Sequence, residues 1–143
     1  SQNYIKQYFH RYPGVYEYMQ STRQIAAEQG FVETVLGRRL YTPDIHARNV
    51  MVRKAAERAA INAPLQGSAA DIIKLAMIAV KKMLPAQHAK LLLQVHDELV
   101  LEVPEDEVDV VTNLVKEAME QSVVLAVPLL VEVKVGENWA KAK

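Results

Sequence analysis

The chain has 143 residues and is 50% hydrophobic, which is enough for one modest core. It contains no cysteine, which excludes disulfides and thiolate metal sites, and no apolar run of about 18 residues, so the sequence predicts no membrane span. It opens with Ser1 and Gln2 rather than with a leader, so we expect a piece of a longer protein.

Charge is distributed unevenly along a chain whose net charge is zero. Residues 1–72 carry 9 basic and 6 acidic side chains, whereas residues 73–143 carry 8 basic and 11 acidic ones. All seven arginines lie at or before Arg58, and arginine is the cation that suits phosphates and base edges. The first half is therefore the better candidate for nucleic-acid contact, although an ordinary solvated surface would have the same composition.

The first elements in chain order are helical. Residues 3–28 have the hydrophobic periodicity of helix, broken at Pro13-Gly14, and predict two helices joined by a tight corner. Gly30 ends the second helix. Residues 31–41 then predict a β-hairpin with a glycine in its turn.

The middle of the chain predicts two further helices. Residues 47–61 are rich in alanine, and Pro64 should kink or interrupt the helix because it lacks an amide hydrogen and its ring clashes with the preceding turn. A second helix over residues 68–84 should end at Pro85. Its core-facing stripe is expected to consist of Ala69, Ile72, Ile73, Ala76, Met77, Val80 and Leu84.

The last third begins with a second hairpin. Residues 91–96 and 99–103 are strand-like runs that flank Asp97-Glu98, so the two acids are expected at the hairpin tip.

A helix and a strand should follow the second hairpin. Acidic residues after Pro104 favour a helix start. Residues 129–135 alternate as in a strand with one buried face. The predicted class is α+β, with helices packed on a small antiparallel sheet. The apolar face of the helix is expected to comprise Val108, Val111, Leu114, Val115, Ala118 and Met119.

Asp97 and Glu98 are the sharpest candidates for chemistry. Carboxylates at the apex of a hairpin with apolar arms would be held rigidly, and magnesium usually takes one or two protein carboxylates. The alternative is that acids are simply common at exposed tips. His96 beside Asp97 also suggests a His-Asp phosphohydrolase, but that site needs more histidines, and the other three are scattered.

A second candidate is a row of polar side chains spaced four residues apart, which share one face of a helix. Its arginine, asparagine and glutamine side chains can donate hydrogen bonds to the acceptors that the DNA minor groove presents at every base pair. An ordinary polar helix face opposite the alanines is the alternative. The row consists of Lys54, Arg58, Asn62 and Gln66.

Several segments, in order, resemble family A DNA polymerases, the bacterial DNA polymerase I type, and the likeness extends from Tyr4 to Lys143. Residues 58–71 and the run at 94–98 are the most specific, the latter resembling the family's third polymerase motif. Residues 33–39, 43–45 and 136–139 also fit. The resemblance implies that Asp97 is a metal-ligating palm carboxylate, that Glu98 is its weaker neighbour, and that His96 lies near the primer terminus.

The same resemblance implies that Arg58, Asn62 and Gln66, with Lys54 on the same helix face, contact the template-primer duplex along its minor groove. Residues 1–45 would be the end of the fingers subdomain, and residues 46–143 the carboxy-terminal part of the palm. The family's reaction is attack of a primer 3′-hydroxyl on a deoxynucleoside triphosphate, assisted by two Mg²⁺ ions, in replication and repair. We expect a bacterial, cytoplasmic, nucleoid-associated location.

The sequence also departs from the family pattern. Family members have a second aspartate on a strand followed by Tyr-Ser-Gln-Ile-Glu, and a helix with Arg, Lys and Tyr that grips the triphosphate, and neither segment occurs here. We therefore expect the isolated chain to be inactive and to self-associate through exposed palm surface. A non-catalytic duplex-binding module and a structural or dimerisation domain are the competing hypotheses.

Overall fold

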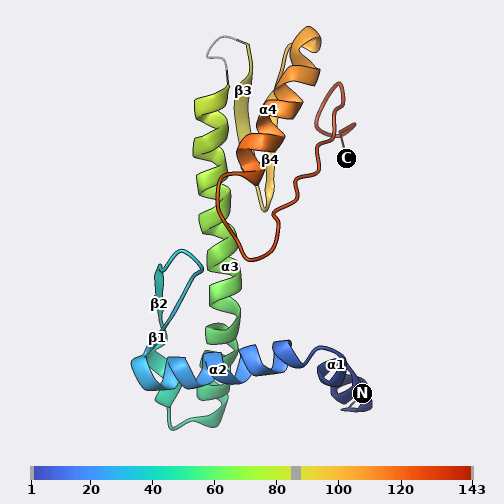
Figure 1. Ribbon diagram of the computed structural model, residues 1–143. Coiled ribbons are helices and arrows are strands. Elements are labelled where there is room, and N and C mark those ends of the chain that lie inside the picture. Colours follow the sequence, from blue (N-terminus) through green and yellow to red (C-terminus); the bar gives the residue numbers. More distant parts are fainter. Residues whose placement is uncertain (1, 85–87, 143) are drawn as a thin grey trace. The chain divides into compact units, whose positions relative to one another are not determined.

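The computed structural model describes residues 2–84 and 88–142. The described residues form helices and two two-stranded antiparallel sheets, which confirms the α+β class (Figure 1). The chain divides into two compact units, Ser1–Ser68 and Ala69–Lys143. The fingers–palm boundary at residues 45 and 46 is a functional division of the family and stays a prediction.

The first unit opens with the two predicted helices, α1 (Gln2–Arg11) and α2 (Pro13–Gln29). Pro13 stands at the start of α2, where its missing amide hydrogen leaves no helix bond unmade. Gly30 ends α2 with a left-handed φ of 79°, and its amide donates to the Ala26 carbonyl. Both helices and the glycine stop are therefore confirmed.

The first hairpin pairs β1 (Phe31–Glu33) with β2 (Arg39–Tyr41) in antiparallel register. Gly37 has a φ of 84°, a conformation that favours glycine, as the prediction of a glycine turn required. A short 3₁₀ turn, η1 (Pro43–His46), leads on toward the long helix.

The long helix α3 (Val50–Met83) runs without interruption through Pro64, so the predicted interruption is wrong, and the predicted kink stays a prediction. A proline removes one intrahelical bond but does not end a helix when small neighbours accommodate its ring and other groups supply hydrogen bonds. Here the residue one turn earlier is Ala60, which has almost no bulk to displace. Pro85, expected to stop the helix, lies outside the described residues.

Alanines form the core of the first unit. Ala26, Val32, Ile45 and Ala60 are buried together. Two of these four residues are alanines, whose short side chains make this a small core. The half-buried residues that pack around them are Ala27, Leu40, Ala56 and Ala63.

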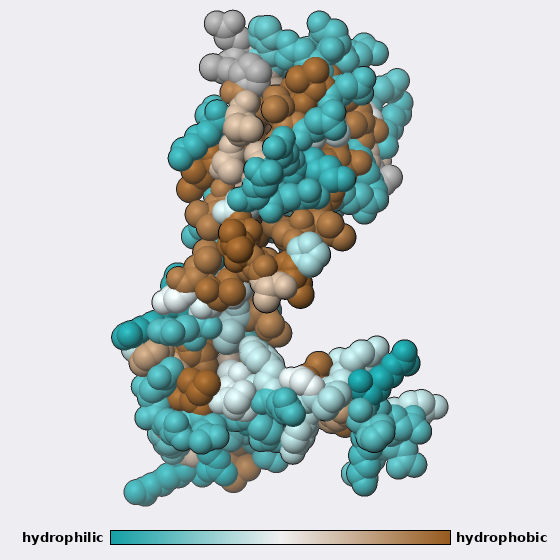
Figure 2. All heavy atoms as spheres, in the orientation of Figure 1, coloured by the Kyte–Doolittle hydropathy of each residue, from teal (hydrophilic) through white to brown (hydrophobic). Residues whose placement is uncertain are grey.

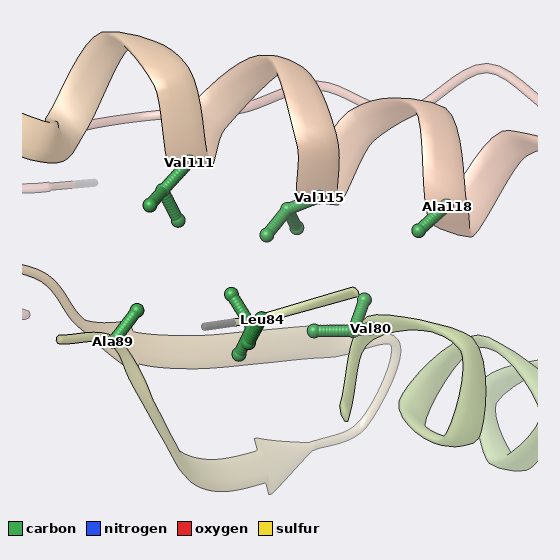
Figure 3. Close-up of a cluster of buried hydrophobic side chains, with 6 residues drawn as sticks. All are labelled: Val80, Leu84, Ala89, Val111, Val115 and Ala118. Atoms are coloured by element: carbon green, nitrogen blue, oxygen red, sulfur yellow. The ribbon is translucent and has the colours of Figure 1, made fainter. Parts of the chain in front are cut away.

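The second unit contains β3 (Lys90–Val95), β4 (Glu98–Glu102), the 3₁₀ turn η2 (Glu105–Glu107) and α4 (Val108–Glu120). The buried face of α4 points at the end of α3 and at Ala89 (Figure 3). The predicted helix face is thus confirmed. The buried cluster consists of Val80, Leu84, Ala89, Val111, Val115 and Ala118.

The predicted stripe on the second half of α3 is largely confirmed. Ala76, Val80 and Leu84 are buried. Ile72, Ile73 and Met77 are half-buried, and Ala69 is exposed.

Residues 129–135 do not form the predicted strand within the described part of the chain. Burial alternates only at the start of this segment, where Leu129 and Val131 are half-buried and Leu130 is 82% exposed, whereas Val133 and Val135 are both exposed. A strand also needs a neighbour that pairs with its backbone, and the Val131 amide instead donates to Glu120 Oε1 at 3.0 Å. The predicted buried face is therefore present only at Leu129 and Val131, and no sheet forms there.

One described helix, α3, is long and apolar enough to meet a composition test for a membrane span. Core helices of soluble proteins pass the same test, which makes this weak evidence.

Candidate functional site: an acidic hairpin tip and a donor row

The tip of the second hairpin is a two-residue turn. Val95 pairs with Glu98, so His96 and Asp97 form the turn and Glu98 is the first residue of β4. The predicted tip of Asp97 and Glu98 is therefore displaced by one residue. Asp97 therefore lies in the turn itself, whereas Glu98 belongs to β4.

His96 adopts a φ of 53°, and no other non-glycine among the described residues has a positive φ. The first position of a two-residue hairpin turn commonly holds glycine, because a Cβ is strained there. The Gln94 side-chain amide donates to the His96 carbonyl at 2.5 Å and closes the turn from within the hairpin. Local backbone strain of this kind gathers at functional sites.

Only one strand of this hairpin faces the core. Leu99 and Leu101 on β4, and Val103 directly after it, pack against the buried cluster. On β3, Leu92 is 51% exposed and Leu93 is 49% exposed, and the register shifts between Leu91 and Leu93. The arms are apolar as expected, but β4 packs against the core along its length, whereas β3 adjoins the core at Ala89, directly before its first residue.

Asp97, Glu98 and His96 are all exposed. The two carboxylates therefore present oxygen atoms that a hard cation or its water shell can reach. No group of three or more His, Asp or Glu side chains placed to hold a metal occurs in residues 2–84 and 88–142.

The donor row, defined as Lys54, Arg58, Asn62 and Gln66, is exposed along α3. Pro64 lies within the last step of the row, from Asn62 to Gln66. The continuity of α3 through Pro64 keeps this step helical. Each helical residue turns by about 100°, so Arg58 lies about 200° from the core residue Ala56. The row therefore faces away from the alanine core of the first unit.

Two contacts that the sequence pattern did not reveal hold α3 beside this row. The Tyr18 hydroxyl on α2 donates to the Ile61 carbonyl at 2.8 Å. The sequence signals this contact only through Pro64. A helix that continues through a proline needs support from outside.

The first hairpin supplies the second contact. The Val35 amide donates to Ser68 Oγ at 2.8 Å, and Arg38 Nη2 donates to the Gly67 carbonyl at 3.3 Å. A Cβ on Gly67 would lie 2.7 Å from Thr34 Cγ2, so only glycine fits under the turn. Two of the segments that resembled the polymerase family, the hairpin turn and the Gly67-Ser68 step, thus touch each other.

Comparison with known proteins agrees with this arrangement. The polymerase domain of Pol1 from M. smegmatis, solved in complex with DNA primer-template and dNTP, superposes with a TM-score of 0.93 and 48% identity over 96% of this chain and 25% of that one. The fold is that of part of a polymerase domain. Residues 1–141 match DNA polymerase family A, and the chain belongs to that family.

Two curated relatives illustrate the extent of the match. The chain is 58% identical over 144 residues to DNA polymerase I of Pseudomonas aeruginosa, which covers 99% of the chain and 16% of that protein. It is 49% identical over 143 residues to the thermostable DNA polymerase I of Thermus aquaticus, with 100% and 17% covered. The chain thus spans about a sixth of the length of these relatives.

Proposed function

We propose that the chain is part of a DNA-directed DNA polymerase that extends a primer with deoxynucleoside triphosphates by two-metal nucleotidyl transfer. The observation that carries the proposal is the position of Asp97 in a strained two-residue turn, within a chain that matches the family along its length. Asp97 is the proposed metal ligand and Glu98 its neighbour. The proposed setting is replication and repair on the nucleoid, in the bacterial cytoplasm.

The residues at the tip fit a hard divalent cation in part. Exposed carboxylate oxygens are the ligands that Mg²⁺ prefers, and it usually binds one or two of them. A two-metal site needs further carboxylates, which the rest of the polymerase would supply. When bound, the metal ions would stabilise the attacking and leaving oxygens of the transfer.

The donor row is the proposed contact with the template-primer duplex. Arg58, Asn62 and Gln66 can donate to purine N3 and pyrimidine O2, acceptors that occur at every base pair of the minor groove. Lys54 continues the row by one step toward the start of α3 and adds a positive charge for the phosphates. His96, exposed at the hairpin tip, is the proposed residue near the primer end.

Substitution of the tip acids in the full-length polymerase tests the proposal. Asp97→Asn removes the metal-binding charge with little change in size, and we expect primer extension to fall by about 100-fold or more, because a metal supplies several kcal/mol of transition-state stabilisation. Glu98→Gln should have a smaller effect. Glu102→Gln, at the exposed far end of β4, is the matched control and should leave the rate unchanged. Equal activity of Asp97→Asn and the control would refute the proposal.

A non-catalytic duplex-binding module remains the second candidate, because the donor row belongs to a unit that does not contain the acidic tip. The two hypotheses separate on one comparison. If the chain serves a polymerase, Asp97→Asn abolishes extension while duplex affinity persists. If it is a binding module only, the full-length protein extends no primer even before substitution.

The isolated chain of 143 residues is proposed to be inactive, because it has one carboxylate site and no triphosphate-gripping helix. The test is a primer-extension assay with the purified chain, Mg²⁺ and all four triphosphates. Magnesium-dependent incorporation that persists after further purification, and is lost in Asp97→Asn, would contradict this proposal.

We also propose that the isolated chain associates with a second copy of itself. On the Ala69–Lys143 unit, large apolar side chains are exposed on and after the second hairpin, and the visible face of that unit shows hydrophobic surface (Figure 2). Light scattering should show a mass above that of one chain at high concentration, and Leu92→Ser with Leu93→Ser should reduce it. A monomer throughout would refute it. The most exposed of these residues are Val124, Val127 and Leu130.

A further inference from the structure

We propose that Tyr18, with Ser68 on the other side, is a positioning residue for duplex DNA: it holds the proline-containing turn of α3 so that Asn62 and Gln66 stay in line with the rest of the donor row. The inference rests on the proposed function, because it assigns a task to residues that do not touch DNA themselves. It explains how a helix that contains Pro64 can present one continuous row of donors.

The weak point of α3 lies inside the donor row. Pro64 stands between Asn62 and Gln66 and has no amide hydrogen to donate to the carbonyl of Ala60, which is fully buried. Its ring also presses on the preceding turn, and prolines are the commonest cause of sharp helix kinks. Without outside support, this turn is where α3 would bend.

A modest bend would misplace the end of the row. Gln66 lies five residues beyond Ile61, or about 7.5 Å along the helix, so a kink of about 20° at Ile61 would move it sideways by about 2.5 Å. Hydrogen bonds to base edges tolerate only a few tenths of an ångström. The residues before the bend, Lys54 and Arg58, would keep their places.

Contacts from other elements hold α3 just before and just after this turn. The half-buried Tyr18 hydroxyl donates to the Ile61 carbonyl at 2.8 Å, one residue before Asn62 and three before Pro64. Two residues after Gln66, Ser68 Oγ accepts the Val35 amide at 2.8 Å. Both contacts lie on the flank of α3, because Ile61 and Ser68 are about 80° and 100° around the helix from the middle of the donor row.

The experiment uses the full-length polymerase and measures the dissociation constant for a primer-template duplex by fluorescence anisotropy, well below the melting temperature of every variant. Tyr18→Phe removes only the hydroxyl. We expect it to weaken duplex binding about five-fold, the change that loss of about one hydrogen bond produces. Tyr16→Phe, an exposed tyrosine on the same helix, is the matched control and should bind normally.

A double-mutant cycle separates positioning from general destabilisation. In a Gln66→Ala background the effect of Tyr18→Phe should shrink to less than about two-fold, because the misplaced side chain is already gone. In a Lys54→Ala background it should persist in full. Ser68→Ala should follow the same pattern.

Equal effects of Tyr18→Phe in both backgrounds, or none in the wild type, would overturn the inference. Failure of the proposed function is a distinct result. There, Arg58→Ala, Asn62→Ala and Gln66→Ala would themselves leave duplex affinity unchanged, whatever Tyr18→Phe does.

Discussion

The two hairpins of this chain have similar size and opposite construction. The first hairpin places Gly37 at its positive φ and is tied to α3 by bonds to Gly67 and Ser68. The second hairpin places His96 at its positive φ, and the hydrogen bond at its tip comes from its own Gln94.

The difference separates a turn that is anchored to a helix from the turn that holds the proposed metal ligand Asp97. The first uses glycine, the residue that relieves strain, and is hydrogen-bonded to α3. The second has His96 at a strained, positive φ and leaves Asp97 exposed to solvent. A strained non-glycine residue and an acidic side chain thus coincide in the turn of the second hairpin, whereas the turn of the first, residues 34–38, contains neither.

Substitution of Gly67 should disrupt the first hairpin most. Gly67→Val puts a branched side chain where a Cβ would already lie 2.7 Å from Thr34 Cγ2, so we expect a loss of about 2–3 kcal/mol in the free energy of unfolding. Urea denaturation followed by circular dichroism measures it. Gly14→Ala, where nothing lies within 4 Å, is the control and should not destabilise. Equal stability of both variants would show that the turn is not clamped.

The second hairpin should depend on one strand only. Leu101→Ala, on the face of β4 that packs against the core, should lower the free energy of unfolding by about 2 kcal/mol. Leu93→Ala, on the 49% exposed side of β3, should cost less than about 1 kcal/mol. The same denaturation assay at low protein concentration compares them, and similar losses would mean that β3 is as well anchored as β4.

Exchanging the turn residues should give effects of opposite sign. Gly37→Ala forces a Cβ into a φ of 84° and should destabilise by about 1 kcal/mol. His96→Gly should stabilise by about 0.5–1 kcal/mol, because it relieves the strain at a φ of 53°. Thermal melting of the two variants side by side is sufficient. A destabilised His96→Gly variant would show that the imidazole makes contacts worth more than the strain.

The smallest expected effect concerns the exposed ion pair on the first hairpin. Glu33 and Arg39 lie 3.2 Å apart but are 45% and 57% exposed, so Glu33→Gln should change stability by less than about 0.5 kcal/mol. Arg39→Gln should cost somewhat more, about 1 kcal/mol, because Arg39 also covers the Phe31 ring at 4.5 Å. Matched melting curves at low and high salt distinguish the two, since only the ion pair is screened.

Local signals predicted most of the elements correctly. The corner at Pro13, the stop at Gly30 and the turn at Gly37 each depend on the conformational limits of one residue, which sequence states directly. The helix faces followed from the hydrophobic period of 3.6 residues.

The errors arose where distant residues decide. Pro64 did not break α3, because Ala60 leaves room for its ring and Tyr18, 43 residues before Ile61, supports the neighbouring carbonyl. Residues 129–135 did not become a strand, because alternation cannot supply a pairing partner.

The candidate site was predictable in its parts. The spacing of the donor row was sufficient to place its members on one helix face, and the hairpin was sufficient to expose Asp97. The displacement of the tip by one residue, and the braces at Tyr18 and Ser68, required coordinates because register and side-chain reach are tertiary properties. The metal and DNA roles of these residues stay predictions.

The four-residue interval of the donor row has a geometric consequence. Neighbouring members rise along α3 by about 6 Å, whereas stacked base pairs rise by about 3.4 Å. Laid along a duplex, each step of the row would span nearly two base pairs, so that successive side chains would reach alternate base pairs. If the proposed minor-groove contact holds, a mismatch moved back from the primer end is expected to weaken duplex binding most at every second position.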